Sequence, residues 1–251
     1  LFITTHNDMK VASNGLLVGE KQINSLNREF HWKHRYPIAT YLVAFVVSNF
    51  KEYSFYAKTK QGSDSVFIQN YIWPQLLNDT LEQIPRIAEL LNLYDRLLGD
   101  YPFKNEKYGH ALFTRGGGME HQTMSFMGNF SYDLMAHELA HQWFGDLVTC
   151  NSWEDLWINE GFATYLTDVA YEFLDKDSVW KYRLDQKFNY IMSENGGSVF
   201  PIDTLDVRAL FSSRLTYEKA SAMIHMIRWN IGDKDFYTGI RNFINAPEHK
   251  Y

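Results

Sequence analysis

The sequence has little cysteine, no long apolar run and no block of like charge, and each absence excludes a class of protein. Cys150 is the only cysteine, which excludes an internal disulfide framework and any metal site built from several cysteines. The longest apolar stretch, residues 38–47, is far shorter than the roughly 20 residues of a membrane helix. Its β-branched and aromatic residues predict a buried strand instead.

The net charge is small, and the charged residues are not clustered by sign along the chain. A net charge of -6 without runs of one sign gives no indication of a nucleic-acid partner. No basic segment followed by an apolar core opens the numbering, so no signal peptide is indicated and the compartment stays open. With 251 residues, 45% of them hydrophobic, the chain can bury a substantial core.

The hydrophobic pattern changes from strand-like to helical along the chain. The first 50 residues combine strand-like patches with the turn signal Asn14-Gly15. From Trp73 to Gly99, apolar residues recur at helical spacing, and Pro85 is expected to kink or split that segment. We also expect a strand over 108–113 and helices over 130–144, 159–173, 178–191, 216–230 and 235–245.

A metal motif lies inside the helix expected over 130–144. In His137-Glu138-Leu139-Ala140-His141 the two histidines differ by about 40° around the helix axis, so both imidazoles face one point. Glu138 is rotated about 60° from His141 and can polarise a metal-bound water without being a ligand. The pattern predicts one Zn²⁺ ion with a catalytic glutamate.

A catalytic zinc takes three protein ligands and leaves its fourth position open to water. Glu160 is the natural third ligand, because the interval after His141 allows the first helix to end at Gly145 and a second, antiparallel helix to begin. The alternative is an ordinary helix whose histidines make hydrogen bonds. A metzincin arrangement is excluded, because its third histidine would fall at Leu147 and its glycine at Phe144.

The other histidines have no such partners, and we expect them to be structural or exposed. They are His6, His31, His34, His110, His121, His225 and His249. His121 stands out because it follows a glycine-rich segment that ends in an acid.

That segment, Gly116-Gly117-Gly118-Met119-Glu120, would alone indicate a turn. Together with the zinc motif it resembles the M1 family of zinc aminopeptidases, gluzincins that include aminopeptidase N and leukotriene A4 hydrolase. The similarity extends to the block Trp157–Ala163 around the third ligand, to Tyr36–Tyr41 and to Tyr101–Phe103. It covers nearly the whole chain.

The resemblance implies a role for each residue of the glycine-rich segment. Glu120 would bind the substrate's free α-amine, beside Met119, while the backbone of Gly117 and Gly118 aligns the peptide. An α-amine has a pKa of about 8 and is largely protonated at neutral pH. A carboxylate at a fixed distance from the zinc therefore selects the first residue of a peptide.

A tyrosine completes the implied site. Any one of 16 tyrosines would by default be a core residue. Tyr217, in Thr216-Tyr217-Glu218-Lys219-Ala220, is similar to the family tyrosine that donates a hydrogen bond to the tetrahedral intermediate, a contribution of about 3 kcal/mol. Two residues depart from the family pattern: His121 replaces an asparagine and Ala220 a glycine.

We therefore predict an α+β protein with a thermolysin-like zinc peptidase domain. Residues 1–50 would be the C-terminal part of an N-terminal β domain, and residues 51–251 the catalytic domain, without the family's helical C-terminal domain. We expect the protein to be covalently continuous with further domains. One of them would supply the second amine-binding group that the family draws from its β domain.

The predicted activity is hydrolysis of the N-terminal peptide bond by a zinc-activated water, with Glu138 as general base. The partners would be peptides with free N-termini, with neither nucleic acid nor a membrane span. The alternatives are a zinc endopeptidase, which has no use for Glu120, an epoxide hydrolase, and an inactive zinc-binding fragment.

Overall fold

The amino-terminal residues form strands, as the strand-like patches in this region predict. The computed structural model describes residues 1–59, 64–201 and 203–246. One antiparallel sheet has the order β1-β4-β3, and β2 pairs with β5 in a second. These strands are β1 (Phe2–His6), β2 (Lys10–Ser13), β3 (Leu16–Gln22), β4 (Asn27–Lys33) and β5 (Phe45–Ser48).

A five-stranded mixed sheet follows, in the order β6-β7-β8-β10-β9. Strands β7, β8 and β10 run parallel to one another, while β6 and β9 are antiparallel to their neighbours. The strands are β6 (Lys51–Thr59), β7 (Asp64–Ile72), β8 (Tyr108–Leu112), β9 (Gly118–Met119) and β10 (Ser125–Met127). The β6–β7 hairpin was not predicted from the sequence.

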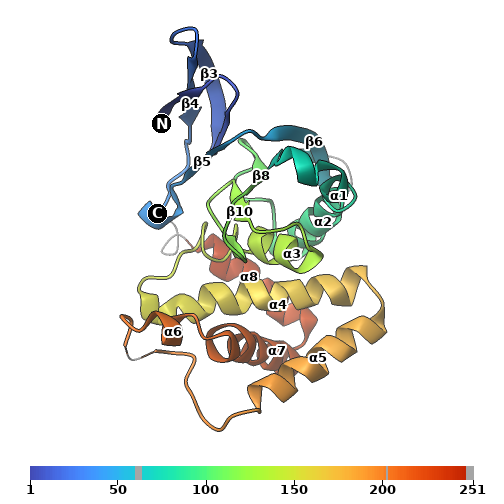
Figure 1. Cartoon of the computed structure of the whole chain (residues 1–251). Helices are drawn as coiled ribbons and strands as arrows, with labels where there is room; N and C mark the ends of the chain where they lie inside the picture. Colours follow the sequence, from blue (N-terminus) through green and yellow to red (C-terminus); the bar gives the residue numbers. More distant parts are fainter. Residues whose placement is uncertain (60–63, 202, 247–251) are drawn as a thin grey trace.

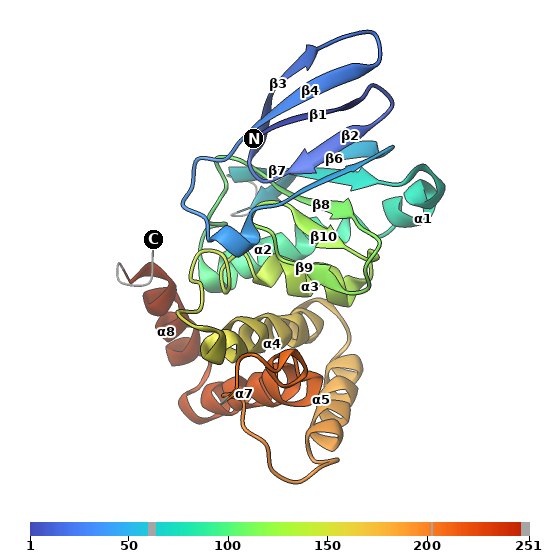
Figure 2. The ribbon, with the colours of Figure 1, turned by 60° about the vertical axis from the view of Figure 1, so that its left-hand side comes forward.

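Most of the remaining described residues form helices and the loops between them. The helices are α1 (Leu77–Leu81), α2 (Arg86–Leu98), α3 (Tyr132–Ala140), α4 (Leu156–Leu174), α5 (Asp177–Ile191), α6 (Val207–Leu210), α7 (Ala220–Ile231) and α8 (Asp233–Asn245). Pro85 separates α1 from α2, as expected. Figures 1 and 2 show the amino-terminal strands at one end, helices α4, α5 and α7 at the other, and the five-stranded sheet with α2 and α3 between them.

Helices α3 and α4 are antiparallel. His137 of α3 lies beside Glu160 near the start of α4, whereas Asp133, one turn earlier, accepts a hydrogen bond from Tyr171 near its end. The buried Tyr94 of α2 places its hydroxyl 3.2 Å from the carbonyl oxygen of Ala136 and 3.0 Å from that of Leu166. Three helices are thus held in register behind the metal motif.

Among the predicted elements that differ from the structure, the first is a strand. Of the strand expected over 38–47, only Phe45–Val47 belong to a strand, β5, and Thr40–Leu42 forms a 3₁₀ turn. The side chain of Asn14 explains the bend, because it bonds the carbonyl of Leu42 and the amide of Ala44.

The helix expected over 130–144 is also shorter. It begins at Tyr132, where the Ser131 hydroxyl accepts a hydrogen bond from the amide of Leu134, and ends at Ala140. The amides of Gln142 and Trp143 bond three residues back, which tightens the last turn.

The α+β class is confirmed. Within the described part of the chain, no helix is long and apolar enough to cross a membrane.

Candidate metal centre and active-site cleft

The three predicted zinc ligands converge. The Nε2 atoms of His137 and His141 lie 3.2 and 3.3 Å from Oε2 of Glu160, and 3.0 Å from each other. One ligand atom from each of these three residues lies within 4.8 Å of the other two, which is a metal-sized grouping. Two imidazole nitrogens and a carboxylate oxygen form the donor set of a catalytic zinc.

The hydrogen bonding of His141 supports this assignment. Its Nδ1 lies 2.9 Å from the carbonyl oxygen of Phe144, which can only accept. Nδ1 therefore carries a proton, and Nε2, which faces His137 and Glu160, is the nitrogen placed to bind a metal. Burial alone would raise the pKa of Glu160, but the charges and hydrogen bonds of His141 and His137 hold it below its usual range. The third ligand is therefore anionic.

Glu138 is buried beside the three ligands without being one of them. Its Oε2 has no hydrogen-bond partner among the residues that the structure describes. Burial raises its pKa well above the ordinary value, and the carboxylates of Glu120 and Glu160 add to this, against an opposing effect of His141. Such a carboxylate binds a proton readily.

Gly118 faces Glu138 directly. A Cβ atom at residue 118 would overlap the Glu138 carboxylate. The φ angle of Gly118 lies outside the left-handed region, so its backbone conformation does not require glycine. Glycine is needed here because only a residue without a side chain can lie this close to Glu138. Gly117, by contrast, has φ of 75° and open space around it, so its requirement is conformational.

Glu120 lines the same cleft on the His141 side. Its carbonyl oxygen lies 3.4 Å from Nε2 of Gln142, the residue after His141. The amide of Thr123 donates to Oε1 of Gln142 at 2.9 Å. One glutamine side chain therefore joins the loop that carries Glu120 to the end of the zinc helix. Burial raises the pKa of Glu120.

His121 points away from Glu120's surroundings. Its Nδ1 lies 3.1 Å from the carbonyl oxygen of Leu42, and its ring packs edge-on against Phe126. Burial lowers the pKa of His121 to about 4, despite the hydrogen bond to Leu42. The histidine that replaces the family's asparagine therefore adds no positive charge beside Glu120 near neutral pH.

Tyr217 lies within a π-helical segment, Ser213–Lys219, which the sequence analysis had taken as regular helix. Its ring stacks on His137 with a centroid distance of 6.1 Å. Burial, and then the carboxylate of Glu160, raise its pKa, so the phenol is neutral and can donate. Ala220, just after this segment, sits against Gly161 of α4, where a Cβ would lie 2.7 Å from that of Ala220.

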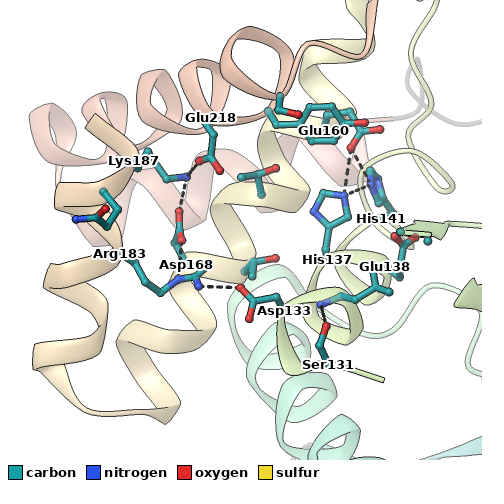
Figure 3. A pocket seen from close by; sticks show the side chains of 18 of the residues that line it. Ser131, Asp133, His137, Glu138, His141, Glu160, Asp168, Arg183, Lys187 and Glu218 are labelled. Atoms are coloured by element: carbon teal, nitrogen blue, oxygen red, sulfur yellow. Dashed lines mark hydrogen bonds and ion pairs between the residues drawn. The ribbon is translucent and has the colours of Figure 1, made fainter. Parts of the chain in front are cut away.

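The cleft around these residues has a volume of about 860 Å³ and extends well beyond the metal ligands (Figure 3). It contains every predicted site residue except Met119, which lies next to it in β9. The residues at the far end of the cleft were not predicted from the sequence, because no motif marks them. They include Asp133, Asp168, Tyr182, Arg183, Lys187 and Tyr190.

The remaining histidines have other roles. His110 is fully buried with Nδ1 2.7 Å from Oδ1 of Asn70, and burial lowers its pKa to about 3. Nδ1 of His34 lies 2.7 Å from the Glu106 carboxylate, and His31 stacks on Phe2. His249 lies outside the described residues.

The known proteins that this chain matches are peptidases of family M1 or aminopeptidases. The model of the peptidase family M1 domain matches residues 112–251. Endoplasmic reticulum aminopeptidase 1 of Mus musculus is 29% identical over 245 residues, covering 88% of this chain and 26% of the relative. Leucyl aminopeptidase of Saccharolobus solfataricus is 27% identical, covering 97% of this chain and 33% of the relative.

A solved structure gives the same fold. The M1 zinc metallopeptidase from Deinococcus radiodurans superposes with a TM-score of 0.86 at 23% identity, covering 98% of this chain and 55% of that one. The chain thus spans between a quarter and a third of the length of these two aminopeptidases.

Proposed function

Because the chain belongs to peptidase family M1, we propose that it forms the catalytic part of a zinc-dependent aminopeptidase acting on peptides with a free amino terminus. The observation that carries this proposal is the position of Glu120. A buried carboxylate shares one cleft with His137, His141 and Glu160, where it can pair with a protonated α-amine.

The ligands of the ion would be His137, His141 and Glu160. When bound, zinc would supply Lewis-acid polarisation of a water molecule and of the first peptide carbonyl. Glu138 would act as the general base, accepting the proton of the attacking water and returning it to the leaving nitrogen. Its burial and its unpartnered Oε2 support this role.

Two further groups would position and stabilise the reacting bond. Tyr217, a neutral phenol stacked on His137, would donate a hydrogen bond to the carbonyl oxygen as negative charge develops. The backbone of Gly117 and Gly118, with Met119 beside them, would align the peptide while Glu120 holds its amine.

The domain organisation is part of the proposal. Residues 1–50 would be the end of a β domain and residues 51–251 a thermolysin-like domain, joined to further domains in the whole protein. Contacts support a close association of the two parts. Asn14 donates to the carbonyl of Gln122 at 2.6 Å, and the amide of Gly15 donates to the Thr123 hydroxyl at 2.8 Å. The amino-terminal strands thus hold the loop that carries Glu120.

Matched peptides with free and acetylated amino termini test this function. Release of the first residue from free peptides, with loss of turnover on acetylation and on zinc chelation, is the expected result. Equal rates on both peptides would identify an endopeptidase, and no zinc-dependent turnover on either would identify an inert zinc-binding module.

A further inference from the structure

The far wall of the cleft is formed by α5, whose lining residues are all polar or aromatic. They are Tyr182, Arg183, Gln186, Lys187 and Tyr190, and their spacing places them on one helical face. Opposite them, α4 presents Thr167 and Asp168. Helices that pack only for stability bury an apolar stripe between them. This polar lining is typical of a surface that meets a ligand.

Five charged groups are connected across this end of the cleft. Nζ of Lys187 lies 2.6 Å from Asp168, 2.8 Å from Glu218 and 2.6 Å from the Ser221 hydroxyl, which uses all three of its N–H donors. Nη1 of Arg183 lies 2.7 Å from Asp133, and its Nε 3.3 Å from Asp168 (Figure 3). Three carboxylates face two cations, which leaves one negative charge in excess.

Two of the three carboxylates are accessible, whereas the Asp168 side chain is only 4% exposed and that of Arg183 is 29% exposed. The side chains of Asp133 and Glu218 are 49% and 32% exposed, whereas that of Lys187 is 5% exposed. Each carboxylate can accept more hydrogen bonds than it receives here. Tyr182 and Tyr190, both exposed, flank them and offer ring faces to a cation. A positively charged side chain therefore finds acceptors and aromatic rings at this place.

The position of this end relative to the metal follows from α3. Asp133, His137 and His141 succeed one another at intervals of about 6 Å along its axis. The carbonyl of Glu120 is held by Gln142, beside His141, so the amine site and Asp133 lie on opposite sides of the metal ligands. A peptide whose amine is at Glu120 would run past His137 toward Asp133, and two extended residues span about 6 Å.

We infer that the α5 end of the cleft is a subsite for a lysine or arginine within the two residues that follow the cleaved bond. This inference rests on the proposed aminopeptidase function and adds a substrate preference to it.

Tetrapeptides test the preference directly. We expect the protein to release leucine from Leu-Lys-Ala-Ala or Leu-Ala-Lys-Ala with kcat/KM about fivefold above that for Leu-Ala-Ala-Ala, and more slowly still from Leu-Glu-Ala-Ala. The preference for lysine should shrink as salt is raised. If the kcat/KM values of the lysine and alanine peptides agree within twofold, or if the glutamate peptide is preferred, the proposed subsite is wrong. Absence of leucine release from all four defeats the proposed function instead.

Variants locate the subsite. Asp133→Asn should reduce the ratio of lysine to alanine peptides, because it removes the most exposed carboxylate. Asp185→Asn is the matched control, since Asp185 is an exposed acid on α5 outside the cleft, and should leave the ratio unchanged. Equal ratios in the two variants would contradict the assignment. Should Asp133→Asn fail to fold, the salt series on the unaltered protein still decides.

Peptide binding gives a readout without turnover. In zinc-loaded Glu138→Gln protein, Leu-Lys-Ala-Ala should bind more tightly than Leu-Ala-Ala-Ala by the same factor as the kcat/KM ratio. Equal dissociation constants would overturn the subsite.

Discussion

Gly118 and Glu138 are in such close contact that a methyl group on residue 118 would overlap the Glu138 carboxylate. The glycine comes from strand β9 and the glutamate from helix α3, so a strand and the zinc helix meet at this point. The backbone beside the metal site can approach the proposed base only because it carries no side chain.

Gly118→Ala should therefore displace Glu138 and reduce kcat by roughly tenfold or more, since a displacement of a general base by about 1 Å is costly. Zinc content and melting temperature are the accompanying measurements. Gly116→Ala is the matched control, because a Cβ there meets open space. Similar kcat values for the two variants would contradict the steric role of Gly118.

Glu138→Gln keeps the shape of the side chain and removes its basicity. We expect kcat to fall by at least about 10²-fold, with one zinc ion per chain retained. Elemental analysis and turnover of a fluorogenic amino-acid amide measure the two quantities. A fully active Glu138→Gln protein would show that another group takes the proton.

Tyr217→Phe removes the hydroxyl and keeps the ring that stacks on His137. The expected result is a fall in kcat of about 10² to 10³, with KM changed little, because the hydrogen bond strengthens as the oxyanion forms. Steady-state kinetics on one peptide separates the two constants. A change in KM alone would assign Tyr217 to substrate binding.

His121 makes stability depend on pH. Burial lowers its native pKa to about 4, below an unfolded value of about 6.5, so only the unfolded chain takes up a proton between these values. The free energy of unfolding should therefore fall by up to about 3 kcal/mol as the pH drops through this window.

Urea unfolding of the parent and of His121→Asn at pH 7 and pH 5 measures this effect. His121→Asn should flatten the slope, whereas His6→Asn, a change at an exposed histidine, should not. Identical slopes for parent and His121→Asn would show that His121 does not keep its low native pKa.

Removal of zinc should lower the melting temperature by about 10 °C, if the ion is present at roughly a thousand times its dissociation constant. Readdition of zinc should restore it. The Glu160→Gln protein should have a lower melting temperature before chelator is added, and chelator should lower it by a smaller amount. An equal fall in melting temperature for parent and variant would show that Glu160 is not a zinc ligand.

The metal ligands could be predicted because their geometry is local. His137 and His141 are one helical turn apart, and the hairpin between α3 and α4 brings Glu160 to them. The class of fold followed from the change of hydrophobic period. The bend at Thr40–Leu42 could not be predicted in this way, because it depends on the side chain of Asn14, which is distant in the sequence.

The far wall of the cleft could not be predicted for a similar reason. Lys187 and Asp168 look like ordinary charges on two helices, and only the packing of α4 against α5 shows that they are buried together. Nor does the sequence reveal that Ser213–Lys219, which packs against α4, is π-helical.

The bonds from Asn14 and Gly15 to the loop at Gln122 and Thr123 bear on how such proteins can be divided or recombined. A cut at residue 50 would leave every proposed catalytic group on one fragment. It would, however, remove the hydrogen bonds from Asn14 and Gly15 that position the loop carrying Glu120. In a chimaera that exchanges the amino-terminal strands of two relatives, the loop at Gln122 and Thr123 would therefore have to come from the same relative as the strands.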